Sequence, residues 1–233
     1  LEAVFAEIDR VARIEPGIRR VFLADGDALA APTDHLIAVL DRLAARFPEL
    51  GRVSSYALPI NLREKSESEL KTLRAKKLTL LYYGIESGSA DIHRRVTKGA
   101  TPEVMVQGLD RARAAGLKVS ATIILGLGGK KRWREHIDGT IKLVNRAPLN
   151  YLSTLILGID PTLDTEFREK FGEPFEAQDD FGILEELEAL VTGLAPRRPI
   201  IFRSNHASNA LALAGNLPTD RDALLAVIRA ARD

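Results

Sequence analysis

Short apolar runs alternate along most of the chain with segments whose apolar residues recur at helical spacing. In residues 33–47, for example, Leu36, Leu40 and Leu43 fall on one helical face. Strands and helices that alternate in this way predict parallel strands joined by crossover helices. The predicted strands are 20–24, 52–56, 78–83, 118–125 and 151–157, and the predicted helices are 1–12, 33–47, 66–76, 89–96, 101–115 and 132–146.

The pattern weakens after residue 160. Residues 161–178 are irregular or weakly helical in their spacing, and they are the best candidate for an insertion or a lid. We expect two parts, a core over 1–160 and a C-terminal helical extension over 161–233 that packs on it. The elements predicted in the extension are a helix at 181–194, a strand at 199–203 and a closing helix at 219–232.

Two α/β architectures fit this alternation of elements. One is a (β/α) barrel, complete or partial, and the other is an open doubly wound sheet. Both place ligand-binding residues in the loops that follow the carboxyl ends of the strands. The residues just after each predicted strand are therefore the first place to look for chemistry.

Composition excludes several classes of function. The chain has 33 Lys and Arg against 32 Asp and Glu, so a net charge of +1 gives no field that would attract nucleic acid. With 45% apolar and 28% charged residues and no long apolar run, we expect a soluble cytoplasmic protein without a membrane partner. Cysteine is absent, which excludes disulfides, thiolate metal ligands and a Cys nucleophile within this chain.

Glycine, short carboxylates and small hydroxyls follow one predicted strand after another. Glycine lets backbone groups approach a ligand closely, and the carboxylates of Asp27 and Glu86 can accept hydrogen bonds from an ammonium group or from ribose hydroxyls. Together they predict a pocket for a small polar molecule, although tight turns that cap the next helix would use the same residues. The segments are 25–27, 54–56, 84–88, 126–129 and 158–160.

The last predicted strand runs into an Asn- and Ser-rich loop. Arg203, Asn205 and His206 are candidate substrate contacts there, and a turn that caps a short helix is the alternative. No two histidines have metal-ligand spacing, so His35, His93 and His136 are expected at the surface or behind a site. The basic run 130–134 opens a helix, where it either faces solvent or lies near a bound anion.

The order of three motifs resembles the radical S-adenosylmethionine (SAM) superfamily, in its coproporphyrinogen-oxidase-like and Elongator-like members. The motifs are D-G-D at 25–27, G-I-E-S-G at 84–88 and T-I-I-L-G-L-G-G at 122–129, and the similarity covers roughly residues 1–160. The resemblance implies a partial (β/α)6 barrel, TIM-like in form. It also implies SAM as cofactor beside a [4Fe-4S] cluster.

The resemblance also assigns roles to residues at the strand ends. The D-G-D segment would receive the methionine amino group, and Glu86 with Ser87 would contact the ribose and the carboxylate. Ile124 and Gly126 would pack against adenine, although Thr122 and Gly129 depart from the family motif at its outer positions. The cofactor-binding residues so expected are Asp25, Gly26, Asp27, Ser54, Glu86, Ser87, Ile124, Gly126 and Leu157.

The cluster is the main departure from the family pattern. Family members hold it with a CX3CX2C loop after a first strand, and this sequence has neither. Because the sequence opens within what would be the following helix, we expect that a segment before Leu1 carries the loop and the first strand. The alternative is a relative without a cluster. This chain alone is then expected to be inactive in SAM cleavage, with no metal ligand and no catalytic residue identified.

For the intact enzyme, the resemblance implies that the reduced cluster passes one electron to SAM. This releases methionine and a 5′-deoxyadenosyl radical, which abstracts a hydrogen atom from a small-molecule substrate of unknown identity. A flavodoxin or ferredoxin would supply the electron. Two alternatives stay open: a cluster-free module that binds SAM or a nucleotide, and a conventional barrel that binds a phosphorylated metabolite at Gly126–Gly129.

Overall fold

The computed structural model describes residues 1–24 and 26–232, so Asp25 lies outside the described residues. Seven strands form one sheet in the order in which they occur along the chain, so that β1 and β7 are its edge strands. Strands β1 to β3 are parallel, as are β5 and β6, whereas β7 is antiparallel to β6. The strands are β1 (Arg20–Leu23), β2 (Arg52–Ala57), β3 (Leu78–Glu86), β4 (Lys118–Leu125), β5 (Tyr151–Ile156), β6 (Ile200–Ser204) and β7 (Leu213–Leu217).

The mostly parallel sheet and its crossover helices confirm the predicted α/β fold class. Among the described residues no helix is long and apolar enough to cross a membrane. The helices are α1 (Glu2–Ile14), η1 (Ala28–Ala30), α2 (Thr33–Arg46), α3 (Pro59–Glu64), α4 (Glu67–Ala75), α5 (Ala90–Arg95), α6 (Pro102–Ala114), α7 (Gly129–Arg146), α8 (Asp164–Phe171), α9 (Asp180–Gly193) and α10 (Arg221–Arg232).

The chain forms two compact units. The first contains Leu1–Tyr83 and Gly108–Ser120, and the second contains Gly84–Gln107 and Ala121–Asp233. The expected division at residue 160 stays a prediction.

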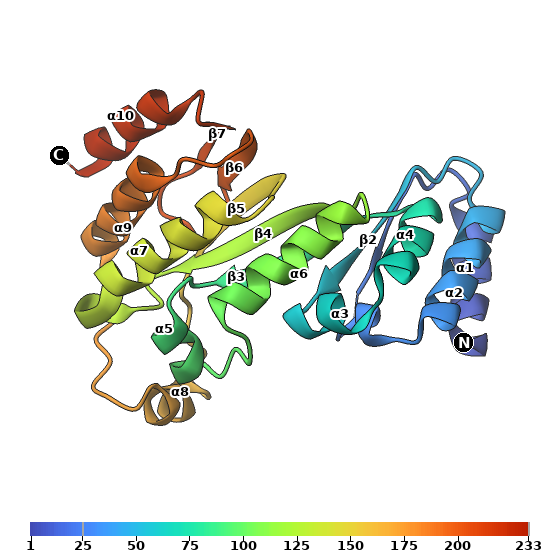
Figure 1. Ribbon diagram of the computed structural model, residues 1–233, viewed down its shortest axis with the longest axis horizontal. Helices are drawn as coiled ribbons and strands as arrows, with labels where there is room; N and C mark the ends of the chain where they lie inside the picture. Colours follow the sequence, from blue (N-terminus) through green and yellow to red (C-terminus); the bar gives the residue numbers. More distant parts are fainter. Residues whose placement is uncertain (25, 233) are drawn as a thin grey trace. The chain divides into compact units, whose positions relative to one another are not determined.

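In the first unit, α1 packs on α2 and α2 packs on α4 (Figure 1). Helix α4 begins where its sequence predicts, because the Ser66 hydroxyl accepts a hydrogen bond from the Glu69 N–H while the Glu69 carboxylate accepts one from the Ser66 N–H. On the opposite face of the sheet, the rings of Phe22, Tyr56 and Tyr82 meet edge to face, with centroids 4.8 to 6.4 Å apart.

In the second unit, α7 packs on α9 and α9 packs on α10 (Figure 1). A separate apolar cluster joins Ile92 and Leu127 to Phe171 and Phe175, with Phe167 packed against it. The three phenylalanines contact one another with ring centroids 4.8 to 5.8 Å apart. These aromatic residues therefore pack together in the C-terminal region.

Exposure alternates along the strands of the second unit. Ile85, Ile123 and Leu125 are buried, whereas Glu86 and Ile124 are half-exposed. Side chains alternate between the two faces of a strand, and the half-exposed Ile124 packs against the apolar cluster of Ile92, Leu127, Phe171 and Phe175.

Three segments are the clearest departures from the sequence prediction in where an element begins or ends. Strand β3 continues to Glu86, so Gly84–Glu86 are strand residues and not a loop, because the alternation of exposure runs on through them. Helix α7 begins at Gly129 and not at 132, with the N–H of Lys130 donating to the Glu176 carbonyl. Helix α8 lies in the segment expected to be irregular or weakly helical, and Gly172 caps its end in the left-handed conformation.

Two elements were not predicted. Helix α3 is only six residues long, and Asn61 stabilises its start by accepting a hydrogen bond from the Leu58 N–H at 2.6 Å. Strand β7 contains Gly215 and Asn216, which disfavour strands, but its antiparallel pairing with β6 stabilises it. The C-terminal extension therefore contains two strands as well as helices.

The turn after β3 lies in backbone contact with α7, which yields a first prediction. A Cβ atom on Gly88 would lie 2.2 Å from the Gly139 carbonyl oxygen, whereas one on Gly158 would meet nothing within 4 Å. Gly88→Ala should lower the free energy of unfolding by roughly 1–3 kcal/mol, as overpacking against rigid backbone does. Urea unfolding measures this, with Gly158→Ala as control, and equal stability of the two variants would contradict the close contact.

Candidate functional site

Glu86 ends β3 in an unusual conformation. Its φ is +62°, a left-handed value that is uncommon for residues other than glycine. Its Oε1 accepts a hydrogen bond from Lys98 Nζ at 2.5 Å, and its Oε2 has no partner among the described residues. Glu86 therefore presents one free carboxylate oxygen at the end of β3, as a site residue at a strand end would.

Gly84 makes room for this ion pair. A Cβ atom at residue 84 would lie 2.7 Å from Glu86 Oε1 and 3.0 Å from Lys98 Nζ. The side chain of Lys98 is only 12% exposed, so its charge is largely withdrawn from solvent and depends on the carboxylate. Lys98 is thus a partner of the site.

A buried histidine joins the ends of β3 and β4. His136 is fully buried, with Nδ1 2.8 Å from Ser87 Oγ and Nε2 2.9 Å from the Ile124 carbonyl oxygen. Because a carbonyl only accepts, Nε2 carries the proton and Nδ1 accepts from the Ser87 hydroxyl. Ser87 Oγ in turn accepts from the Ser89 N–H at 3.0 Å.

These hydrogen bonds require the imidazole of His136 to be neutral, because its Nδ1 accepts one of them. Burial lowers the pKa of His136 to about 4, although its hydrogen bond to the Ile124 carbonyl opposes the shift. The Ser87 hydroxyl is fully buried and used within the protein, so it positions Ile124 through His136. Of the two positions expected for these histidines, His136 takes the one behind the site, and His93 lies buried between the carbonyls of Ile85 and Ala100.

A second buried titratable group holds the next residues of β4. Glu186 on α9 is fully buried and accepts the Gly126 N–H through Oε2 at 2.7 Å. Its Oε1 accepts from Gln178 Nε2 at 3.1 Å. Burial raises the pKa of the Glu186 carboxyl to about 7, against the two hydrogen bonds, which lower it.

Gly126 and Leu157 line one cavity at the carboxyl ends of β4 and β5. The cavity has a volume of about 240 Å³, and the Leu157 N–H donates to the Leu125 carbonyl at 2.9 Å across the two strands. Gly126 has a φ of +81°, and a side chain there would approach Ile183 to 3.0 Å. The structure thus brings Ser87, Ile124, Gly126 and Leu157 together, in hydrogen bonds or along one cavity wall.

The other residues of the cofactor prediction lie in the first unit. Asp27 Oδ2 accepts from Asn61 Nδ2 at 2.9 Å, while Oδ1 is buried without any partner among the described residues. Gly26 is exposed with a φ of +65°, and Ser54 is buried in β2. An orphaned buried carboxylate oxygen is rare in proteins and suits a donor supplied by a ligand. Of the predicted D-G-D segment, Asp25 lies outside the described residues.

The predicted substrate residues lie after β6. Arg203, Asn205 and His206 are exposed, and His206 Nδ1 is 2.8 Å from Ser208 Oγ within the same turn. Asn209 fixes this turn, because its Nδ2 donates to the Thr154 carbonyl at 2.8 Å. These contacts describe an ordered turn, and its role towards substrate stays a prediction.

The glycine loop and the basic run do not offer an anion site. The Gly126 and Lys130 N–H groups already donate to Glu186 and to the Glu176 carbonyl. The Lys130 side chain pairs with Glu176 at 3.0 Å, and Lys131 pairs with Glu173 at 2.8 Å. The ammonium groups of Lys130 and Lys131 are therefore paired with carboxylates of the protein. This differs from both expectations, a face open to solvent and a bound anion nearby.

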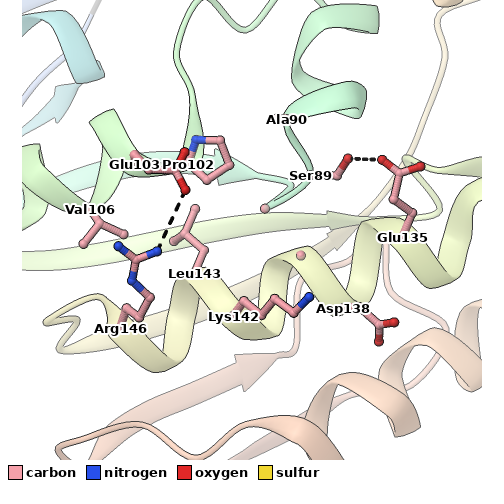
Figure 2. Close-up of a pocket in the computed structure, with 12 residues that line it drawn as sticks. Ser89, Ala90, Pro102, Glu103, Val106, Glu135, Asp138, Lys142, Leu143 and Arg146 are labelled. Carbon is pink, nitrogen blue, oxygen red and sulfur yellow. Dashed lines mark hydrogen bonds and ion pairs between the residues drawn. The ribbon is translucent and has the colours of Figure 1, made fainter.

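Another cavity of the second unit lies between α7 and the starts of α5 and α6. It has a volume of about 480 Å³, and Figure 2 shows Glu135 bonded to Ser89 and Glu103 facing Arg146 along its walls. Acidic and basic side chains both line this cavity. None of the residues predicted to contact cofactor or substrate lies in its lining. In the described part of the chain, no group of three His, Asp or Glu side chains is placed to hold a metal ion.

Sequence reasoning missed Lys98, His136 and Glu186 as members of this site. Their partners are 12, 49 and 60 residues away along the chain. The one available signal is in α9, where Glu186 falls between Ile183 and Leu190 on the apolar face of an otherwise amphipathic pattern. A carboxylate on such a face requires a buried partner.

His136 should make the protein sensitive to acid. Its pKa is near 6.5 when unfolded and about 4 when folded, so below pH 6.5 the unfolded chain binds a proton that the folded chain does not. Stability then falls as the pH drops from 6.5 towards 4, by on the order of 3 kcal/mol. Urea unfolding of the native chain and of His136→Gln at pH 7.5 and 5 tests this, since the variant lacks this part of the slope. Parallel slopes would contradict it.

Glu186 should act in the opposite direction. Because its pKa is about 7 when folded and about 4.5 when unfolded, the folded chain binds the extra proton, and stability falls as pH rises from 4.5 to 7. Relative to Glu186→Gln, the native chain should lose on the order of 3 kcal/mol over this range. The same unfolding series at pH 5 and 8 measures the difference, with exposed Glu64→Gln as control. A gap that stays constant would show that Glu186 is ionised throughout.

Comparisons with known proteins agree with this fold. The model of the radical SAM superfamily matches residues 1–144. A Pyrococcus horikoshii protein described as an uncharacterized methyltransferase is 25% identical over 109 residues, which are 47% of this chain and 23% of that protein.

Solved structures share the fold at low identity. Escherichia coli coproporphyrinogen III oxidase, described as a radical SAM enzyme, aligns with a TM-score of 0.66 at 21% identity, over 82% of this chain and 44% of its own. An N-terminally deleted Elp3 from the archaeon Methanocaldococcus infernus aligns with a TM-score of 0.61 at 15% identity, over 88% of this chain and 52% of its own.

The chain spans about half the length of these two structures and 23% of the matched methyltransferase. The family match covers more than half of the present chain and includes Asp27, Glu86 and Gly126 at the ends of β1, β3 and β4. The predicted resemblance is confirmed: this chain belongs to the radical SAM superfamily.

Proposed function

We propose that this chain is the SAM-binding part of a radical SAM enzyme. The observation that carries the proposal is the family match over residues 1–144, which hold most of the strand-end groups described above. In this proposal Gly26 and Asp27 receive the methionine amino group, and Glu86 binds the ribose or the carboxylate end. Ile124, Gly126 and Leu157 contact adenine, and Ser54 and Ser87 support them from within the sheet.

The free acceptors of the two units suit this cofactor. Asp27 Oδ1 lacks a donor among the described residues, and an ammonium group is the strongest donor that SAM offers. Glu86 Oε2 is likewise free to accept from a hydroxyl, while Lys98 Nζ donates to Oε1. The apolar wall beside Gly126 suits a planar base.

The cluster is different, because this chain has no cysteine to ligate it. In the proposed enzyme a [4Fe-4S] cluster, bound by thiolates from outside this sequence, supplies the electron for reductive cleavage of SAM. A small-molecule substrate and an electron donor of the flavodoxin or ferredoxin type complete the proposal. The residues of this chain bind and orient SAM and exclude water from it.

The lack of cysteine favours a second candidate function. A family member without a cluster would be a module that binds SAM or a nucleotide and leaves its sulfonium intact. A phosphorylated metabolite at Gly126–Gly129 has less support, since the Gly126 N–H already donates to Glu186 and the Gly129 N–H to the Gly126 carbonyl.

Calorimetry with the 233-residue chain and SAM tests the shared part of both candidates. Saturable binding is expected, and Asp27→Asn and Glu86→Gln should each weaken it about tenfold or more, because a hydrogen bond to a charged group contributes about 1.5–3 kcal/mol. Glu64→Gln, an exposed carboxylate without a partner among the described residues, is the control and should bind as the native chain does. No heat at millimolar SAM would remove both candidates.

Reconstitution separates the enzyme from the module. The natural full-length protein, loaded with iron and sulfide and reduced with dithionite, should form 5′-deoxyadenosine from SAM if the first candidate is correct. Binding of SAM without this product would favour the module.

A further inference from the structure

The cavity at the ends of β4 and β5 is lined by aliphatic side chains and by one uncharged polar side chain. Asp164 and Arg168 also line it, and they form an ion pair with each other at 2.8 Å. Gln178 also lines the cavity, and its Oε1 has no partner among the described residues. The aliphatic wall comprises Ile156, Leu157, Ile159 and Ile183.

The orientation of this amide is fixed by its neighbour. An ionised carboxylate only accepts hydrogen bonds, so Gln178 must turn its NH2 group towards Glu186 and its oxygen away from it. Glu186 cannot rotate freely to release the amide, because its other oxygen accepts the Gly126 N–H at 2.7 Å. The backbone of β4 thus determines, through Glu186, which atom of Gln178 is left free.

The protein also makes room for the amide in this position. A Cβ atom on Gly182 would lie 2.2 Å from Gln178 Oε1 and 2.8 Å from its Cδ. Any side chain at residue 182 would displace the amide, so glycine at the start of α9 permits the arrangement. Glu186, Gly182 and Gly126 together form a preorganised holder for one amide.

We infer that Gln178 is a specificity-determining residue that accepts a hydrogen bond from the amino group of a planar base in this cavity, with Glu186 as its positioning residue. The inference rests on the proposed function and refines it. Adenine carries an amino donor at its six position, whereas an oxo base carries an acceptor there. An acceptor opposite the Gln178 oxygen leaves two acceptors facing each other, and the amide cannot flip without facing its oxygen to the Glu186 carboxylate.

Protonation of Glu186 releases this constraint. A protonated carboxyl can donate, so Gln178 can then turn its oxygen towards Glu186 and its NH2 towards the ligand. Burial raises the pKa of Glu186 to about 7, and the neighbouring Glu185 carboxylate raises it further. The other charged groups at this cavity, Asp164 and Arg168, pair with each other. Selection for an amino base should therefore weaken on acidification.

Two ligands that differ only in the base test the inference by calorimetry on the 233-residue chain. S-adenosylhomocysteine carries the amino group, and S-inosylhomocysteine carries oxygen in its place. At pH 8 the native chain should bind the adenosyl compound at least about tenfold more tightly. This preference should fall at pH 6, as a larger share of Glu186 is protonated.

Variants distinguish recognition of the base by Gln178 from a purely structural role of this residue. Gln178→Met removes the acceptor, and Glu186→Gln allows either amide orientation, so both should reduce the preference to within about twofold at both pH values. The controls are Gln107→Met and Glu169→Gln, exposed residues away from this cavity, and they should keep the native preference. Circular dichroism establishes that each variant folds.

The remaining outcomes distinguish failure of the role of Gln178 from failure of the proposed function. If the adenosyl compound binds and the preference is absent, or persists unchanged in Gln178→Met and Glu186→Gln, the role of Gln178 is overturned and the proposed function stands. If neither compound nor SAM binds to the native chain, the proposed function fails, and the inference fails with it.

Discussion

The carboxyl end of β4 is held by hydrogen bonds from three separate elements, and the candidate site depends on this constraint. His136 on α7 donates to the Ile124 carbonyl, the Leu157 N–H after β5 donates to the Leu125 carbonyl, and Glu186 on α9 accepts the Gly126 N–H. A strand end without such bonds would leave polar backbone groups buried and unpaired, at a cost of about 1–3 kcal/mol each. These bonds fix the backbone of three consecutive residues, Ile124, Leu125 and Gly126, which belong to the motif at 122–129.

Two of these three bonds come from titratable side chains that are fully buried. Burial alone would make each unfavourable, but each is surrounded by the partners that its favoured state needs. Neutral His136 lies between an acceptor and a hydroxyl, and Glu186 lies between two N–H donors. Their pKa values are shifted in opposite directions, to about 4 and about 7, so they make the stability of the same strand end respond oppositely to pH.

The positions of the regular elements could be predicted from the sequence, because their signals are local. Strand β4 was predicted at its observed bounds from a short, mainly apolar run, and α4 was predicted to within one residue at each end. Helix α8 and strand β7 could not be predicted, because neither has strong intrinsic preference. Phe171 packs in a cluster with Phe175, and β7 pairs with β6, so tertiary contacts stabilise both.

The sequence by itself determined the order of strands and helices, the glycine and acidic residues that follow the strands, and the absence of any thiolate ligand. These properties depend on residue type and spacing within one or two elements. Only the tertiary structure decided that Lys98 neutralises Glu86, that His136 bonds to Ile124, and that Glu186 orients Gln178 beside Gly126. The sequence does not give such pairs, because a buried charge or dipole is satisfied by whichever distant element packs against it.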